Sequence, residues 1–181
     1  MGDNVKVGIS GLPGSGKSST IVQVVDRLEA EGELVGGMIT EGIYEGEEKV
    51  GVKIKNVLTG EEGILAHKDY DSGVRVGDFG VDLNILDTVG VKALQDASQV
   101  AQIVAIDEVG KLEMGSEKFI GAVRTLMEED KFMIMTLHKR SRDPLLQEIR
   151  RRDDVRILEV TPINRNLLPI KIERILHKDE L

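Results

Sequence analysis

The chain has 181 residues, a hydrophobic content of 40% and a formal net charge of −8. This length suits one domain over residues 1–181, and the acidic balance makes nucleic acid an improbable partner, because such an interface needs a basic face. The absence of cysteine excludes disulfides, thiolate metal sites and cysteine nucleophiles. No apolar run is long enough to span a bilayer, and the first residues lack the apolar core of a signal peptide, so we expect a cytoplasmic protein.

Apolar patterning predicts alternating strands and helices. We expect a strand over about 5–10, a helix over about 17–31, and antiparallel extended segments from Leu34 to Lys68. Gly and Asp breaks predict a surface loop from His67 to Asp82. Beyond it the pattern predicts a helix over about 84–99, strand 103–106, helix 116–129, strand 132–137, helix 143–152, strand 155–160 and helix 164–177. This order predicts an α/β three-layer sandwich, with a mostly parallel central sheet and an antiparallel hairpin extension.

Residues 11–18 form a complete phosphate-binding motif, G-x-x-x-x-G-K-[ST], between an expected strand and an expected helix. In that setting the glycines let the backbone curl close to phosphate, where amide groups and the helix dipole converge. Lys17 would act in catalysis by bridging β- and γ-phosphate oxygens, and the Ser18 hydroxyl would ligate Mg²⁺. The predicted nucleotide-binding residues here are Gly11, Leu12, Pro13, Gly14, Ser15, Gly16, Lys17 and Ser18.

Two acids, Asp107 and Glu108, follow the apolar run that predicts the strand at 103–106. Such a pair by itself is more often a helix cap or a solvated turn, but beside a phosphate loop it favours catalysis. We predict that Asp107 holds Mg²⁺, directly or through water. We predict that Glu108 orients or deprotonates a water that attacks the γ-phosphate.

A second segment, Leu86-Asp87-Thr88-Val89-Gly90, fits the D-x-x-G element of GTPase switches. The guanine-reading Asn/Thr-Lys-x-Asp element that should accompany it is absent from the sequence, and Asp87 does not follow a clear buried strand. We therefore interpret Asp87 as a residue that initiates or caps a helix.

The segment after the acid pair resembles a known family. Residues 107–113 read Asp-Glu-Val-Gly-Lys-Leu-Glu, with Ser116 and Phe119 beyond, which is similar to the D-E-[IV]-G-K-[ML]-E and Ser-x-x-Phe segments of small nucleoside triphosphatases, including the cancer-related ones. Segments 37–41, 50–54, 76–81 and 161–165 also resemble that family. Departures are Val52 for Phe, Asp78 for a basic residue, Asn166 for Asp, and a hairpin without the usual arginines. These departures leave the phosphate loop and the acid pair unchanged, and they bear on substrate preference and on the rate of hydrolysis.

The resemblance implies a three-layer P-loop NTPase fold and Mg²⁺-dependent hydrolysis of ATP, GTP, CTP and UTP to diphosphates, with little base selectivity. It also implies nucleotide contacts by Ile103, Val104, Ala105, Ile106, Asp107, Glu108, Val109 and Gly110. By analogy with related P-loop folds, strand 132–137 lies beside the loop, where Thr136 or His138 would sense the γ-phosphate. Lys111, Arg165 and Arg75 are candidates for stabilising transition-state charge, although each is more commonly a surface charge. Arg165 is the best of them, because the resemblance places an Asn-Arg pair there.

Two alternatives share the phosphate loop. A nucleotide or small-molecule kinase would close a basic lid over the phosphates, and the stretches 139–142 and 150–152 could serve as one, although the second is better interpreted as a helix C-cap. Phosphate release without an acceptor would favour the triphosphatase. A nucleotide-dependent binding switch would instead use slow hydrolysis to reset a contact with another macromolecule.

Overall fold

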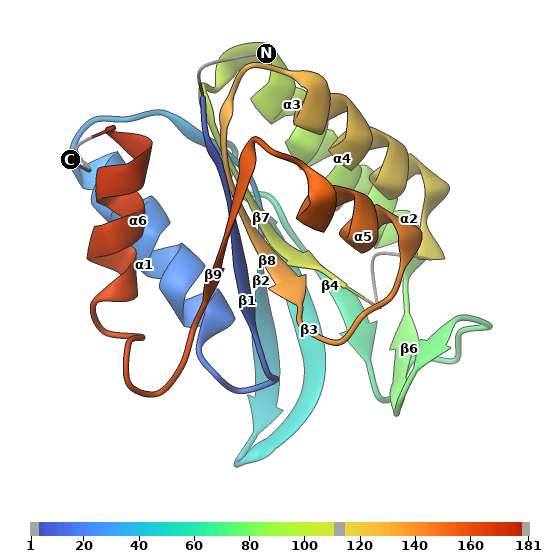
Figure 1. Cartoon of the computed structure of the whole chain (residues 1–181). Coiled ribbons are helices and arrows are strands. Elements are labelled where there is room, and N and C mark those ends of the chain that lie inside the picture. The colour runs from blue at the N-terminus through green and yellow to red at the C-terminus, as the bar shows by residue number, and fades with distance from the viewer. Residues whose placement is uncertain (1–3, 111–114, 179–181) are drawn as a thin grey trace.

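The computed structural model describes residues 4–110 and 115–178, and its centre is one mixed β-sheet (Figure 1). The strands along the chain are β1 (Lys6–Gly11), β2 (Val35–Glu45), β3 (Glu48–Asn56), β4 (Glu62–His67), β5 (Arg75–Val76), β6 (Phe79–Val81), β7 (Ile103–Val109), β8 (Phe132–His138) and β9 (Val155–Glu159). The helices are α1 (Lys17–Ala30), α2 (Leu83–Ile85), the π-helix η1 (Leu86–Val91), α3 (Lys92–Val100), α4 (Glu117–Glu128), α5 (Pro144–Arg151) and α6 (Leu168–Leu176). The strands lie in the order β5-β6-β4-β3-β2-β7-β8-β1-β9.

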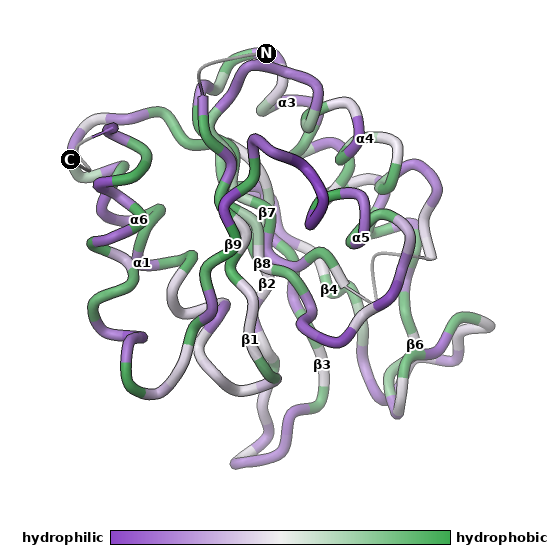
Figure 2. The backbone as a smooth tube through the Cα atoms, viewed as in Figure 1, coloured by the Kyte–Doolittle hydropathy of each residue, from purple (hydrophilic) through white to green (hydrophobic). Residues whose placement is uncertain are grey.

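Helices cover both faces of the parallel part of the sheet: α1 and α6 on one side, and α3, α4 and α5 on the other (Figure 1). Successive residues of β7 alternate between the two cores, since Ile103 and Ala105 pack toward α1 while Val104 and Ile106 pack toward α3 and α4. Both faces of these strands are therefore apolar. Figure 2 shows hydrophobic residues along the central strands β7 and β8. The predicted α/β three-layer architecture is confirmed. Among the described residues, no helix has the length and apolar character needed to cross a membrane.

Five neighbouring strands, β2, β7, β8, β1 and β9, are parallel. Strand β8 pairs with both β1 and β7, and its register places Thr136 opposite Ile9 and His138 opposite Gly11. The expectation that strand 132–137 lies beside the phosphate loop is thus confirmed. Because the carboxyl ends of parallel strands meet at one edge, the loop after β1 and the acids of β7 lie at the same edge.

The rest of the sheet is antiparallel and larger than a single hairpin. The predicted extended segments form β2, β3 and β4, but the surface loop expected from His67 to Asp82 contains a further hairpin, β5 and β6, which pairs with β4. Strands of two and three residues are too short for alternation to reveal. Arg75 donates to the carbonyl oxygens of Tyr70 (3.1 Å) and Asp78 (2.7 Å), so it fastens this hairpin. Arg75 is one of the candidate cations that are more commonly surface charges, and its place on the edge strand β5 agrees with a structural role.

The helical stretch predicted over about 84–99 is observed from Leu83 to Val100, but Asp87 does not begin it. Asp82 is the N-cap, and its carboxylate accepts hydrogen bonds of 2.9 and 3.1 Å from two backbone N–H groups. Asp87 lies within η1 and accepts a 2.6 Å hydrogen bond from the hydroxyl of Ser116, the N-cap of α4. The interpretation of Asp87 as an initiating or capping residue is therefore wrong, because this carboxylate links two helices.

The last helix begins at Leu168, later than the predicted start near Asn164. The Asn164 side chain holds a turn: its oxygen accepts from the N–H of Thr161 (2.8 Å), and its amide donates to the carbonyl of Glu159 (2.8 Å). Asparagine side chains often compete with the helical backbone in this way. The turn carries Arg165 toward the phosphate loop.

Replacing Gly37 by alanine should destabilise the protein by about 2–3 kcal/mol. Gly37 has a φ of +112°, and an added Cβ would lie 1.9 Å from the carbonyl oxygen of Ala105 on the neighbouring strand β7. Urea unfolding measures the change. In the control Gly121→Ala the new Cβ meets nothing within 4 Å, so this helix variant should gain about 0.5–1 kcal/mol. Unchanged stability of Gly37→Ala would contradict the strand packing described here.

Candidate functional site

The loop between β1 and α1 gathers backbone groups around a small concave surface. Gly16, which precedes the helix, has a φ of +105°, a left-handed conformation that side-chain-bearing residues rarely adopt. No side chain among the described residues caps the N-terminus of α1, so its first N–H groups remain available to an anion. The nearly buried Lys17 ammonium bends back and donates to the carbonyl oxygens of Gly11 (3.0 Å) and Leu12 (3.3 Å). The loop therefore combines exposed amides with a held cation.

Asp107 lies next to this loop and has no exposed surface. Its Oδ1 accepts hydrogen bonds from the hydroxyls of Thr136 (2.7 Å) and Ser18 (3.2 Å), and its Oδ2 accepts one from the Thr40 hydroxyl (3.4 Å). These three donors come from β8, α1 and β2. Burial raises the pKa of the Asp107 carboxyl, and the hydrogen bonds from Thr136 and Ser18 oppose that rise. The structure thus brings together Ser18 and Asp107, the two predicted metal ligands.

Strand β7 continues to Val109, past the predicted end at residue 106. In the sequence, Asp107 and Glu108 indicate that the buried strand ends before them, because an unpaired carboxylate is costly to bury. Here the hydroxyl donors around Asp107 allow the strand to continue. The side chains of Ile103, Val104, Ala105, Ile106 and Val109 are buried in the two cores rather than directed into the site.

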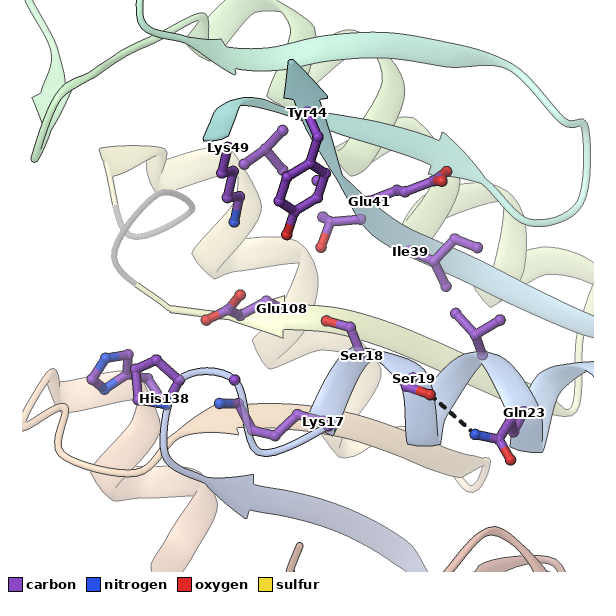
Figure 3. A pocket seen from close by; sticks show the side chains of 17 residues that line it. Lys17, Ser18, Ser19, Gln23, Ile39, Glu41, Tyr44, Lys49, Glu108 and His138 are labelled. Atoms are coloured by element: carbon purple, nitrogen blue, oxygen red, sulfur yellow. Dashed lines mark hydrogen bonds between the residues drawn. The ribbon is translucent and has the colours of Figure 1, made fainter. Parts of the chain in front are cut away.

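An open cleft of about 750 Å³ lies between the loop and the β2–β3 hairpin (Figure 3). One wall is the loop with the first turns of α1, including Lys17 and Ser18. The opposite wall is the hairpin, whose lining side chains include Tyr44 and Lys49. Glu108 lines the cleft between these walls, at the end of β7. The two predicted catalytic residues, Lys17 and Glu108, therefore face the same space.

Two buried side-chain atoms of the described residues lack a hydrogen-bond partner, and both belong to this region. They are the Ser15 hydroxyl oxygen, within the loop, and Nδ1 of His138, whose ring lines the cleft. Unpaired buried polar atoms are rare in native proteins and ask for an explanation. A polar ligand in the cleft would supply one for His138, whereas Ser15 does not line the cleft.

Other predicted site residues have different positions. Arg165 is exposed and lies beside Gly16, since a Cβ added to that glycine would come within 3.8 Å of the Arg165 Cδ. Arg165 stands in the turn before α6 and is not among the described residues that line the cleft. Lys111 lies outside the described residues.

The basic stretches that suggested a lid have structural partners. Arg150 donates to the carbonyl oxygens of His138 (2.5 Å) and Ser141 (2.7 Å), so it braces the loop after β8. Lys139 pairs with Glu159, and Arg152 bonds to acids and to a backbone carbonyl on other elements. Arg150 and Arg151 stand in the last turn of α5 and Arg152 is its C-cap, so the interpretation of 150–152 as the basic C-terminus of a helix is confirmed.

Sequence reasoning did not single out Thr40, Tyr44 or Lys49 as site residues. Thr40 stands within the segment 37–41 that resembled the family, so a signal was present. Tyr44 and Lys49 carry no motif, and they reach the cleft because of the hairpin's position in the sheet.

The glycine-rich loop lies between β1 and α1 and ends with Lys17 and Ser18. It faces Asp107 on the parallel strand β7, which is separated from β1 by β8. This arrangement defines a P-loop nucleotide-binding protein. A family model described as NTPase matches residues 6–173, and the chain belongs to that family. The family suggested by residues 107–119 is thus confirmed, and with it the class of enzyme, a nucleoside triphosphatase.

Similar proteins match over nearly their full lengths. The nucleoside-triphosphatase THEP1 of Picrophilus torridus is 33% identical over 176 residues, which cover 97% of this chain and 98% of that protein. The crystal structure of THEP1 from the hyperthermophile Aquifex aeolicus superposes with a TM-score of 0.86 at 30% identity, covering 94% of this chain and 98% of that one. The solution structure of a human cancer-related nucleoside triphosphatase gives 0.82 at 30% identity, covering 98% and 100%. The predicted fold is thereby confirmed.

Proposed function

We propose that this protein hydrolyses the β–γ phosphoanhydride bond of nucleoside triphosphates, with Mg²⁺, to give the diphosphate and inorganic phosphate. One observation carries the proposal: the fully buried carboxylate of Asp107 contacts the hydroxyl of Ser18 at the end of the phosphate loop. The donors at this site, namely loop amides, Lys17 and hydroxyls, address phosphate rather than a base. ATP, GTP, CTP and UTP all offer that phosphate, which supports broad base tolerance.

The residues at this site fit a magnesium ion. A carboxylate oxygen of Asp107 and the hydroxyl oxygen of Ser18 lie 3.2 Å apart, and hard oxygen donors are the ligands that Mg²⁺ prefers. No group of three His, Asp or Glu within the described ranges is placed to hold a metal alone. Mg²⁺ commonly uses one or two protein ligands and completes its shell with substrate phosphates and water. When bound, the ion would neutralise charge on the phosphoryl oxygens.

Each step of the hydrolysis would depend on a different residue of the site. Lys17 would leave its two loop carbonyls and donate to β- and γ-phosphate oxygens, where negative charge develops. Glu108, which lines the cleft, would orient a water for in-line attack and accept its proton. Asp107 would orient Ser18 through the hydrogen bond that the two already share.

The strand between the loop and the acids adds two further roles. Thr136 donates to Asp107, so it would position that carboxylate rather than sense the γ-phosphate. His138 lines the cleft with an unpaired Nδ1, and it would be the sensor. Arg165, beside Gly16, would contribute positive charge on the α6 side of the bound nucleotide. Lys111 remains a candidate from sequence.

Phosphate release from the four triphosphates, measured with Mg²⁺ and with a chelator, tests the function. We expect release of phosphate with every triphosphate, only when Mg²⁺ is present, and without any acceptor. Hydrolysis that needs an added acceptor would instead make the protein a kinase.

Replacing Glu108 by glutamine should lower kcat by about 10²–10³-fold, because an amide cannot accept the proton of the attacking water. Binding of a non-hydrolysable Mg-triphosphate should persist, since the loop and Asp107 are intact. Phosphate release and calorimetric titration measure the two quantities. The control Glu47→Gln changes an exposed acid of the hairpin turn and should hydrolyse normally. Near-normal turnover of Glu108→Gln would remove Glu108 from the mechanism.

A further inference from the structure

The cleft described above has a second cation, on the hairpin wall. Among the described residues that line it, the lysines are Lys17 and Lys49, and they come from opposite sides. Figure 3 shows the ammonium end of Lys49 directed into the cleft, toward the side from which Glu108 projects. Lys17 reaches the phosphates from the loop, so Lys49 would approach the same phosphate chain from the other side.

The Lys49 ammonium is unpaired, whereas two other lysines of this part of the sheet, Lys53 and Lys68, have acidic partners. Lys53, on the same strand, bonds to Glu41 (3.5 Å) and Glu62 (3.2 Å), and Lys68 bonds to Glu48 (3.2 Å). Within the described parts of the chain, the Lys49 side chain has no hydrogen bond or ion pair. Its charge is therefore available to a ligand in the cleft.

The hairpin geometry explains why Lys49 faces the cleft. The register of β2 and β3 shifts between Ile43 and Tyr44, and the next pair along the ladder is Tyr44 with Lys49. A bulge of this kind redirects the side chains beside it. Tyr44 also lines the cleft, and its ring lies over Gly42, where a Cβ would come within 2.7 Å of it.

Charge balance in the cleft favours a cation at this place. Asp107 and Glu108 are adjacent acids, and Glu108 contributes to the raised pKa of Asp107 through charge repulsion. Glu41, which also lines the cleft, already has its partner in Lys53. A triphosphate would add further negative charge between the walls. Lys49 is placed to compensate that charge where Lys17 does not reach.

We propose that Lys49 is a further catalytic residue, whose ammonium donates to terminal phosphate oxygens and stabilises the charge that develops on them during hydrolysis. It would act in cis, supplied by the β2–β3 hairpin. This inference rests on the proposed triphosphatase function and names a residue of that same site. It adds a cation that the chain's motifs do not reveal.

The test compares Lys49→Ala and Lys49→Arg with Lys55→Ala, which removes the same charge from the same strand but lies outside the cleft. For Lys49→Ala we expect kcat to fall by about 10²-fold, the size of effect seen when one preorganised donor is removed. Lys49→Arg should retain much of the rate, and Lys55→Ala should match the wild type. A loss confined to KM would overturn the proposal, because it would show uniform binding.

A binding measurement separates this inference from the proposed function. The wild type should bind a non-hydrolysable triphosphate more tightly than the diphosphate. The ratio of these two affinities should be about tenfold smaller in Lys49→Ala. A preference unchanged within about twofold would overturn the role of Lys49 even if hydrolysis is confirmed. If the wild type hydrolyses nothing, the proposed function fails, while the affinity ratio still decides whether Lys49 contacts the terminal phosphate. Because Lys49 is exposed, its variants should melt at the wild-type temperature.

Discussion

Lys17→Ala should lower kcat/KM for nucleoside triphosphates by about 10³-fold or more, since the variant loses the cation that contacts both the β- and γ-phosphates. In the free protein this ammonium is bound to two loop carbonyls, those of Gly11 and Leu12. These bonds preform the position of the charge, and the nucleotide would exchange them for stronger bonds to phosphate.

The fold should survive this change. Loss of two hydrogen bonds to loop carbonyls costs about 1–2 kcal/mol, and water entering the open cleft can satisfy those carbonyls. Phosphate release and thermal unfolding, measured on the same preparation, separate the two effects. Lys171→Ala, an exposed lysine of α6, is the matched control and should hydrolyse normally. Turnover retained in Lys17→Ala would reject the assignment of the loop.

Asp107→Asn should also abolish hydrolysis, by about 10³-fold, because a neutral amide cannot support the metal ion at Ser18. The same change should make the nucleotide-free protein more stable at neutral pH, by roughly 1–2 kcal/mol, because a buried charge without a cation is replaced by a neutral group. The amide keeps an oxygen for the hydroxyls of Ser18 and Thr136, and its NH₂ group can donate to Thr40. A gain in stability with a loss of function identifies a site whose geometry serves a ligand.

The pH dependence follows from the raised pKa of Asp107. The folded state holds this proton at pH values where the unfolded state has released it, so the Asp107 contribution lowers the free energy of unfolding as pH rises from the unfolded pKa through the folded pKa. Asparagine does not titrate. The stability difference between Asp107→Asn and the wild type should therefore be small in acid, grow across that window and then level off. A difference that is constant with pH, measured by urea unfolding, would contradict this account of Asp107.

The same proton competes with the metal. Binding of Mg-nucleotide requires the charged carboxylate, so the affinity of the wild type should fall as pH falls through the raised pKa. Titration of the wild type with Mg-nucleotide at each pH of the unfolding series measures this dependence.

Much of the fold could be predicted from sequence because its signals are local. The buried parallel strands are continuous apolar runs, and helices α1, α4 and α5 begin and end close to the expected residues. The misses have local causes too. The β5–β6 hairpin is too short for alternation to show, and α6 begins late because Asn164 holds a turn. Asp87 was misread because its partner, Ser116, is 29 residues away.

What the sequence alone determined is the chemistry available: a phosphate loop, a lysine, a serine and an acid pair, each recognised from adjacent residues. The tertiary structure decided how these groups are held and what surrounds them. Thr40 and Ser18 meet Asp107 across 67 and 89 residues of chain, and Lys49 reaches the cleft only because β3 follows β2 at one side of β7. Strand order and register are set by packing over the whole sheet, so no local pattern contains them.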